Sequence, residues 1–260
     1  MRAVCWLLLS FALLLDAAAA PACPQRLRVG FMDRPIPPYL EGSGNRFAQP
    51  APGWAVAWAR QTFAALGCEP EWVRAPVRRL AQELARDDLQ FIVGFAHSAE
   101  REALMRFPQG SDGALDTRLN LGVAEVVLFA LASREDHGDR AEPGAEHPVG
   151  VVPGAVEEPL ARARGWSVEL APTHDANLAK LRAGRVHWVL APRLAFGVAD
   201  LQREPRVQAL KPPVQRALYF APASRWLFSQ HPEFVQAVWL GLCERSRQQP
   251  ELAQAGEPCR

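Results

Sequence analysis

The sequence has almost no net charge, and this lack limits the partners that it can have. Its 29 Lys and Arg residues are balanced by 28 Asp and Glu residues, which gives a formal net charge of +1 at pH 7. Proteins that bind nucleic acid or an anionic membrane surface through charge carry a basic patch or stripe. The sequence has no such cluster and no acidic tail, so we expect neither nucleic acid nor a membrane surface as a partner.

Motifs of several enzyme and metal-binding classes are also absent. The sequence contains no G-x-S-x-G and no H-E-x-x-H, and its PVGVVPG segment lacks the lysine and the glycine spacing of a phosphate-binding loop. No two cysteines have C-x-x-C spacing, and the six histidines are scattered singly. Structural zinc sites need such paired ligands. We therefore expect no metal and no cofactor, and a protein that is not an enzyme.

Long apolar runs are lacking after the N-terminal residues. Met1-Arg2 gives a short charged start, residues 4–15 an apolar core, and residues 20–22 a small-residue cleavage motif. This order is typical of a secretory signal peptide, and the apolar core is too short to span a bilayer stably. We expect residues 1–22 to be removed and residues 23–260 to be a soluble periplasmic protein. A lipoprotein acylated at Cys23 and a retained anchor are the alternatives.

Four cysteines remain after such a cleavage: Cys23, Cys68, Cys243 and Cys259. An even number in an exported chain indicates disulfides, and four cysteines allow three pairings. We favour Cys23 with Cys68 and Cys243 with Cys259. Cys23 and Cys68 each come just before a strand, and we expect those two strands to be parallel neighbours. Both cysteines would then lie at the same edge of one sheet.

Apolar runs alternate with segments of helical periodicity in two parts of the chain. In the first part we expect strands at 27–31, 71–74 and 89–93, and helices at 53–66 and 77–84. In the second part we expect strands at 149–152, 166–170 and 186–190, and helices at 157–164 and, capped by Asp175, up to Gly184. Further strands at 123–131 and 216–221 and a helix starting at His231-Pro232 complete the pattern. Two βαβαβ sets predict an α/β chain with two lobes, each a doubly wound sheet with flanking helices.

Ligands of such sheets bind beyond the carboxyl ends of the strands. Two loops of the first part qualify. The loop 32–39 contains three prolines, which forbid a helix there, and the stretch GFAHSAERE, residues 94–102, follows a buried strand. We expect these two loops to form one lip of a ligand cleft.

Five segments in order carry a resemblance to a known family: LRVGF with PPY, GWAVAWARQTFAALG, FIVGFAHSAEREALMRFP, VGVVPGAVEE and LAKLRAGRVHWVL. Together they resemble the bacterial extracellular solute-binding proteins of family 3, the periplasmic amino-acid-binding proteins of ABC transporters. The resemblance implies a two-lobed periplasmic-binding-protein type II fold, with lobe 1 at residues 23–118 plus 216–260 and lobe 2 at residues 119–215. It also implies a monomer that closes about a hinge on a small ligand, and an ABC permease or another periplasmic partner.

For the GFAHSAERE stretch, the resemblance implies a carboxylate-binding site. Arg101 would hold the ligand's carboxylate through its guanidinium fork. Gly94, Phe95, Ala96 and Ser98 would provide the surrounding contacts, and Ser98 would also cap the helix that carries the arginine.

Further ligand contacts are expected on both lobes. Tyr39 and Asp33 lie in the proline-rich loop of lobe 1, and the backbone N–H groups of Ala155 and Val156 lie at a helix start in lobe 2, where anions bind. The chain departs from the family at Pro192, where an aspartate would bind the ligand's ammonium, and at Ala155 and Val156, where threonine is usual.

These departures favour a small anionic ligand that bears a carboxylate but no ammonium, or a peptide or aromatic fragment. Two alternatives remain. One is a sensor or accessory module with a degenerate site that binds a partner protein. The other is an enzyme on the same fold, similar to cyclohexadienyl dehydratase, with Glu157 or Glu158 as acid or base.

Overall fold

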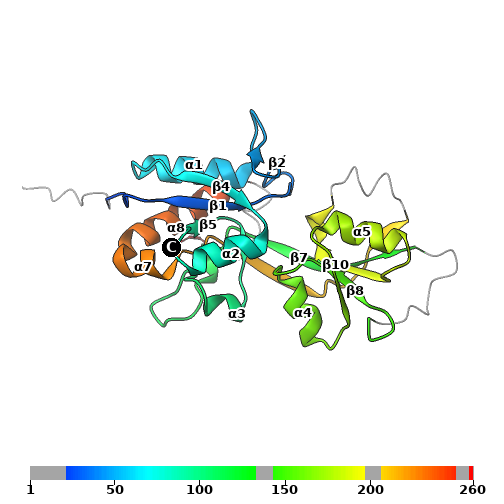
Figure 1. The fold of residues 1–260 in the computed structure, drawn as a ribbon. Coiled ribbons are helices and arrows are strands. Elements are labelled where there is room, and N and C mark those ends of the chain that lie inside the picture. Colours follow the sequence, from blue (N-terminus) through cyan, green and yellow to red (C-terminus); the bar gives the residue numbers. More distant parts are fainter. Residues whose placement is uncertain (1–21, 133–142, 197–205, 250–257, 260) are drawn as a thin grey trace, which may run out of the picture.

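The computed structural model describes residues 22–132, 143–196, 206–249 and 258–259. The predicted signal peptide, apart from Ala22, lies outside these residues. The chain forms two α/β lobes that lie side by side, linked by long strands (Figure 1). None of the helices in the described ranges has the length and apolar character needed to cross a membrane.

Lobe 1 is built on a three-stranded parallel sheet in the order β4-β1-β5. Its strands are β1 (Arg28–Met32), β4 (Glu71–Ala75) and β5 (Phe91–Ile92), and its helices are α1 (Trp54–Ala65), α2 (Val77–Ala85), α3 (Ala99–Glu102), α7 (Arg225–Gln230) and α8 (Pro232–Ser246). The predicted βαβαβ unit is confirmed, with the stop of α1 at Gly67, whose φ of +69° suits glycine after a helix. The predicted helix that begins at Pro232 is also confirmed. A small hairpin of β2 (Gly42–Ser43) and β3 (Arg46–Phe47) projects from the same lobe.

The strand predicted at 89–93 is shorter than expected and spans Phe91–Ile92. The chain leaves the parallel sheet after Val93, whose N–H still bonds to the oxygen of Gly30 in β1 at 2.9 Å. Gly94 has a φ of +76°, and its N–H bonds to the oxygen of Phe220. Residues 95–96 then form β6 in another sheet. The GFAHSAERE stretch therefore starts where the chain changes sheet.

The buried face of α1 differs from the one that the sequence pattern indicates. The i, i+3, i+4 spacing predicts one buried side made of Trp54, Ala57, Trp58, Gln61, Ala65 and Leu66. Of these six residues only Trp58 is fully buried, and Gln61 and Ala65 are exposed. The buried side chains are those of Ala55, Val56, Trp58, Ala59, Thr62 and Phe63. Because α1 is apolar on more than one side, periodicity alone does not determine which side faces the core. The packing of Val56 and Phe63 in the core determines this orientation.

Lobe 2 and its connection to lobe 1 share a mixed sheet in the order β6-β12-β7-β10-β8-β9, with β11 also paired to β7. The strands are β6 (Phe95–Ala96), β7 (Gly122–Leu131), β8 (Val149–Val151), β9 (Val168–Leu170), β10 (Trp188–Pro192), β11 (Val207–Ala209) and β12 (Gln215–Phe220). The helices are α4 (Glu157–Ala163) and α5 (His174–Arg182), with 3₁₀ turns η1 (Thr117–Leu119) and η2 (Arg193–Ala195) in the chain. The cap of α5 is Thr173, whose hydroxyl accepts from the N–H of Ala176, and not Asp175 as predicted.

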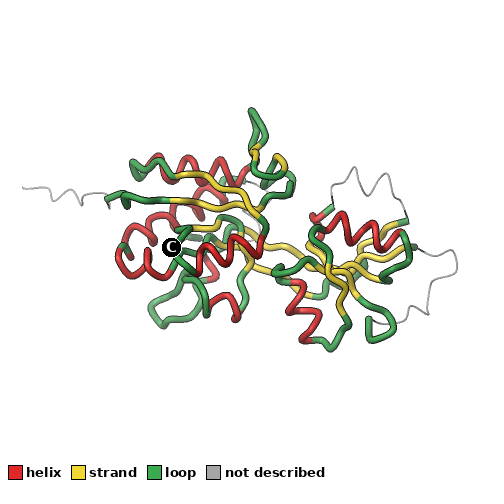
Figure 2. Tube along the Cα trace, viewed as in Figure 1, coloured by secondary structure: helices red, strands yellow, loops and turns green. Residues whose placement is uncertain are grey.

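Two antiparallel strands connect the lobes. β7 and β12 pair from Gln215 opposite Val126 to Tyr219 opposite Gly122, and the trace in Figure 2 shows these strands running from one lobe into the other. The residues of β12 nearest lobe 1 pair with β6. The connection is therefore a continuous piece of sheet.

Each lobe has its own core. The core of lobe 1 takes residues from both ends of the described chain, as in the packing of Phe63 against Phe234, with ring centroids 6.4 Å apart. The cores of lobe 2 lie on the two faces of its sheet, around Leu190 and around Phe129.

Both disulfides have the predicted pairing and lie in lobe 1. Cys23 is bonded to Cys68, with their Cα atoms 5.5 Å apart, and Cys243 is bonded to Cys259, with Cα atoms 6.0 Å apart. Since β1 and β4 are parallel neighbours, the residues that precede them do meet at one sheet edge. Neither disulfide crosses between the lobes.

Candidate functional site

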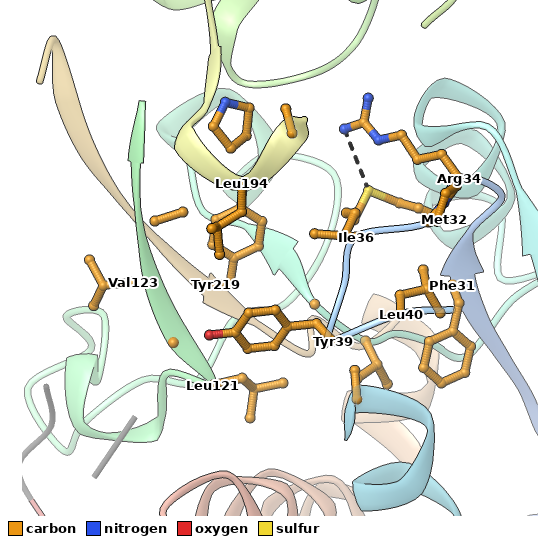
Figure 3. A pocket seen from close by; sticks show the side chains of 18 of the residues that line it. Phe31, Met32, Arg34, Ile36, Tyr39, Leu40, Leu121, Val123, Leu194 and Tyr219 are labelled. Carbon is orange, nitrogen blue, oxygen red and sulfur yellow. Dashed lines mark hydrogen bonds between the residues drawn. The ribbon is translucent and has the colours of Figure 1, made fainter. Parts of the chain in front are cut away.

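A pocket of about 880 Å³, partly open to solvent, lies between the lobes (Figure 3). One wall comes from the end of β1, the loop after it, α1 and the residues that follow β5. The opposite wall comes from the start of β7 and from lobe 2 residues His174, Pro192, Leu194 and Ala195. Small-molecule sites occur preferentially at such domain interfaces.

The lining of this interlobe pocket is mostly apolar. Figure 3 shows Ile36, Leu40, Leu121, Val123 and Leu194 around it, and Tyr39 reaching across its floor. No Asp or Glu is among the described residues that line it, and its charged lining residue is Arg34. Nor do the described parts of the chain contain a group of three or more His, Cys, Asp or Glu residues that could hold a metal ion.

The proline-rich loop is folded tightly against α1. Ile36 and Leu40 form an antiparallel bridge, and the N–H of Tyr39 bonds to the oxygen of Ile36 at 2.8 Å. The Tyr39 ring packs edge-on against Trp54 and Trp58 of α1, at centroid distances of 5.5 and 6.3 Å. The loop thus forms a fixed apolar wall.

Arg74 holds the base of this loop from β4. Its buried guanidinium donates to five backbone oxygens, those of Met32, Arg34, Glu41, Gly42 and Arg46. Burial lowers its pKa, and the charge of Asp33 opposes that change. Arg74 is therefore structural, and it fixes the backbone from which the Arg34 side chain starts.

A second, smaller pocket of about 260 Å³ adjoins the first. It is lined by the GFAHSAERE stretch and by the start of α4, and Met32, Arg34, Gly94 and Tyr219 line both pockets. Arg101 is in this smaller pocket and is 9% exposed.

The Arg101 guanidinium is engaged by the protein itself. Nη1 donates to the oxygen of Ala96, and Nη2 donates to the oxygen of Gly154 in lobe 2 at 2.7 Å. Its Cζ lies 3.9 Å from the ring centroid of Phe95, a cation–π contact. Burial lowers the pKa of Arg101 to about 10, with Glu157 opposing that shift, so the side chain stays cationic at neutral pH.

Glu157, in the lining of the smaller pocket, and His174, in the lining of the main pocket, form a buried pair. They are 1% and 3% exposed, and His174 Nε2 lies 3.6 Å from Glu157 Oε1. Burial raises the pKa of Glu157, although Arg34 and Arg101 oppose this, and burial lowers the pKa of His174 well below its usual value, with Arg34 adding to the effect. Both side chains are therefore biased toward their neutral forms. Glu157 Oε2 and both His174 ring nitrogens lack hydrogen-bond partners among the described residues.

Most of the predicted site residues come together here. Tyr39 and Gly94 line the main pocket, and the smaller pocket is lined by Gly94, Phe95, Ala96, Arg101, Ala155 and Val156. Asp33 and Ser98, both described, line neither pocket. Ser98 occupies the cap position of α3, but its side chain makes no capping bond. The N–H of Ala155 is used within its own turn, where it bonds to the oxygen of Val152.

Sequence reasoning missed Arg34, His174 and Trp58 as pocket residues and considered Glu157 only as an acid or base. Arg34 could have been found, because it lies just beyond the carboxyl end of β1, where ligands bind in such sheets. No comparable signal marked His174, which reaches the pocket from the first turn of α5.

No protein-family model matches the chain, and no curated protein matches its sequence. Solved structures do match, over most of their length. The GluR0 ligand-binding core from Nostoc punctiforme in complex with L-glutamate has 15% identity and a TM-score of 0.64, over 88% of this chain and 96% of that one. A putative binding component of an ABC transporter from Wolinella succinogenes, complexed with lysine, has 15% identity and a TM-score of 0.60, over 88% and 98%.

A third match is a histidine kinase sensor domain with similarity to periplasmic binding proteins, at 16% identity and a TM-score of 0.64, over 86% of this chain and 95% of that one. At such identities the likeness concerns the fold. It confirms the two-lobed periplasmic-binding-protein type II fold, which the resemblance to family 3 solute-binding proteins implied.

Proposed function

We propose that this chain is a periplasmic solute-binding protein that closes about its connecting strands on a small carboxylate-bearing ligand. The observation that carries the proposal is the interlobe pocket, to which both lobes contribute walls. The Arg34 guanidinium and the apolar lining of this pocket suit a ligand with an anionic group and an apolar body. Two of the solved proteins named above are complexed with amino acids, L-glutamate and lysine, and the third is a histidine kinase sensor domain.

Closure would move two units of the chain relative to each other. We assign residues 23–118 and 216–260 to lobe 1 and residues 119–215 to lobe 2, so that the chain passes between the lobes just before β7 and again at the start of β12. The lobes have separate cores, which extend past these bounds: Leu119 and Leu121 pack in the lobe 1 core, and Ala96 and Ala217 pack in a lobe 2 core. Hinge closure around a ligand excludes water and changes the outer surface that a partner contacts. That partner is an ABC permease if the role is uptake.

Sensing is a second role for the same binding event, and the match to a histidine kinase sensor domain favours it. In that case a membrane receptor, and not a permease, would read the closed form. The two roles differ in the partner and share the ligand site. Both require export, which follows if residues 1–22 are cleaved; mass spectrometry of the exported protein's N-terminus tests this.

The test of ligand binding is thermal unfolding of the oxidised protein, residues 23–260, with amino acids, dicarboxylates, 2-oxo acids, aromatic acids and short peptides. A ligand present at 100 times its Kd adds about 2.7 kcal/mol to the stability, or about 5–10 °C in Tm for a chain of this size. A rise with a carboxylate compound supports the proposal. No rise with any compound would contradict it and favour a module that binds a partner protein, which a pull-down from periplasm would then identify.

A further inference from the structure

We propose that the ligand of the interlobe pocket is a hydrophobic monocarboxylate without an amino group, and that its carboxylate is bound by Arg34 and not by Arg101. This inference rests on the proposed solute-binding function and specifies its ligand class. It assigns a binding role to Arg34, which the sequence analysis did not consider.

The guanidinium groups of Arg34 and Arg101 differ in how far the protein itself already engages them. Arg101 already donates to two backbone oxygens, one on each side of the cleft, and packs on Phe95. Arg34 lines both pockets, and its side-chain hydrogen bond within the described ranges is a long one, 4.0 Å from Nη2 to the Met32 sulfur. Its Nε is buried without a hydrogen-bond partner among the described residues, and Figure 3 shows the side chain beside the pocket.

A guanidinium with free donors beside an apolar cavity is suited to a carboxylate. The planar fork matches the two carboxylate oxygens, and such a pair strengthens where water is excluded. The backbone of Arg34 is held in place, since its oxygen accepts from Arg74 at 3.1 Å. The fork therefore starts from a rigid position, which limits the entropy lost on binding.

His174 provides a second donor from the opposite lobe. The ring lines the main pocket, is 3% exposed, and has both nitrogens without partners in the described part of the chain. A neutral imidazole carries one N–H donor, and a buried donor without a partner costs free energy that a ligand oxygen would recover. Arg34 and His174 lie on different lobes, so a carboxylate bound by both would also favour closure.

The lining residues of the main and the smaller pocket argue against an ammonium group on the ligand. No carboxylate is present among the described lining residues of the main pocket, and Pro192 occupies part of its wall. Glu157, which lines the smaller pocket, is fully buried, and burial favours its neutral form. An amino acid would bury an unpaired charge in this apolar cavity, which is costly.

The apolar lining specifies the rest of the ligand. Side chains of Ile36, Tyr39, Leu40, Trp58, Leu121 and Leu194 surround the cavity. Burial of apolar surface contributes about 25 cal/mol per Å², so an aliphatic chain or an aromatic ring gains affinity here and a small dicarboxylate does not. A second carboxylate would lack a cation, because Arg101 is engaged.

The test compares compounds that share one apolar body and differ in charge. 3-Phenylpropionate is the anion, L-phenylalanine the zwitterion, phenethylamine the cation and 3-phenylpropanol the neutral form; octanoate and octanol repeat the comparison with an aliphatic body. Binding is measured by calorimetry and by tryptophan fluorescence, since Trp58 lines the pocket. The proteins are the oxidised chain of residues 23–260, Arg34→Gln, and Arg46→Gln, which removes an exposed arginine of the neighbouring hairpin.

We expect the two carboxylates to bind at least tenfold more tightly than the alcohols, the amine and phenylalanine. We expect Arg34→Gln to abolish that preference while affinity for the alcohols stays within about twofold, and Arg46→Gln to behave like the parent. Stronger binding of phenylalanine or phenethylamine, or an unchanged preference in Arg34→Gln, would overturn the inference. If no compound of this series binds but an amino acid or dicarboxylate raises Tm, the ligand class is wrong and the solute-binding function stands; if nothing raises Tm, the function itself fails.

Discussion

Nη2 of Arg101 in lobe 1 donates a hydrogen bond to the backbone oxygen of Gly154 in lobe 2, at 2.7 Å. The two residues are 53 positions apart in the chain. The arginine that the resemblance assigns to the ligand's carboxylate thus connects the two lobes directly. This contact makes Arg101 a determinant of how the lobes sit together, and it leads to the first two predictions.

Replacing Arg101 is expected to loosen the contact between the lobes. Arg101→Met leaves the oxygens of Ala96 and Gly154 without their donor and removes the contact with Phe95. Loss of such charged hydrogen bonds typically costs about 1.5–3 kcal/mol, and we expect Tm to fall accordingly. Small-angle X-ray scattering should show a larger radius of gyration. Arg60→Met, at an exposed position of α1, is the control, and an unchanged radius for Arg101→Met would contradict the connecting role.

Gly154 is expected to tolerate no side chain, because it lies against the other lobe. A Cβ atom there would be 3.2 Å from the Cβ of Arg78 and 3.4 Å from its Cα, and the residue has a φ of +75°. Gly154→Ala should therefore cost the strain of a positive φ, roughly 1–2 kcal/mol, and also push the lobes apart.

Gly165→Ala is the matched control for this change. Gly165 has a φ of +72° but nothing within 4 Å of its Cβ position, so only the strain applies. We expect similar losses of Tm from strain, with an increase in the radius of gyration for Gly154→Ala alone. Equal scattering profiles for the two variants would show that the close approach at Gly154 does not set the spacing of the lobes.

Glu157 is expected to limit stability at neutral and higher pH. Burial raises the pKa of Glu157 on folding above the usual 4.5. The stability that its neutral carboxyl supports is therefore fully present below about pH 4.5 and is lost as the pH rises through the pKa of the folded state. Glu157→Gln should therefore gain stability relative to the parent as the pH increases from 4 to 8, by about 1–3 kcal/mol. Urea unfolding across this range measures it, with Glu69→Gln on an exposed loop as control.

His174 changes the stability with pH in the opposite direction, and its effect must be separated from that of Glu157 in the same experiment. Burial lowers its pKa below the usual 6.5, so the stability that it supports is present above about pH 6.5 and is lost as the pH falls. Glu157→Gln should leave this acid-side loss in place. A difference between parent and Glu157→Gln that shrinks with rising pH would contradict the predicted sign.

The Cys243–Cys259 disulfide is expected to stabilise lobe 1 by fastening the segment after α8. It closes a loop with a sequence separation of 16, for which chain entropy predicts roughly 3 kcal/mol. The double variant Cys243→Ser, Cys259→Ser should lose about that amount in urea unfolding under oxidising conditions. Ligand affinity should stay unchanged, because neither cysteine lines a pocket described above.

Local chemistry in the sequence was enough to predict most of the elements and the disulfides. Pro232 and Gly67 marked helix ends, and the parallel strands after Cys23 and Cys68 placed these cysteines together. The errors arose where two local signals competed. Thr173 and Asp175 are both good helix caps, and α1 is apolar on more than one side.

The site was predicted less completely, because its geometry depends on contacts between distant segments. Spacing located the GFAHSAERE stretch at the pocket, but it could not show that Arg101 would be engaged by Gly154. Likewise, Arg74 orders the loop that carries Arg34 by donating hydrogen bonds to five backbone oxygens, and no sequence motif predicts these bonds. Such contacts follow from how the lobes and loops pack.

The composition of the lobe 1 core has a consequence for the order in which the lobes fold as the exported chain emerges from the membrane. Phe63 packs against Phe234, so this core needs α8, one of the last segments to be made. The cores of lobe 2 are complete, apart from Ala96, with residues between 126 and 217. Domains fold as units as the chain emerges. We therefore expect lobe 2 to complete its fold first, while the N-terminal part of lobe 1 stays unfolded until α8 has emerged. A chain released before α8 would carry a folded lobe 2 and an exposed, aggregation-prone half of lobe 1.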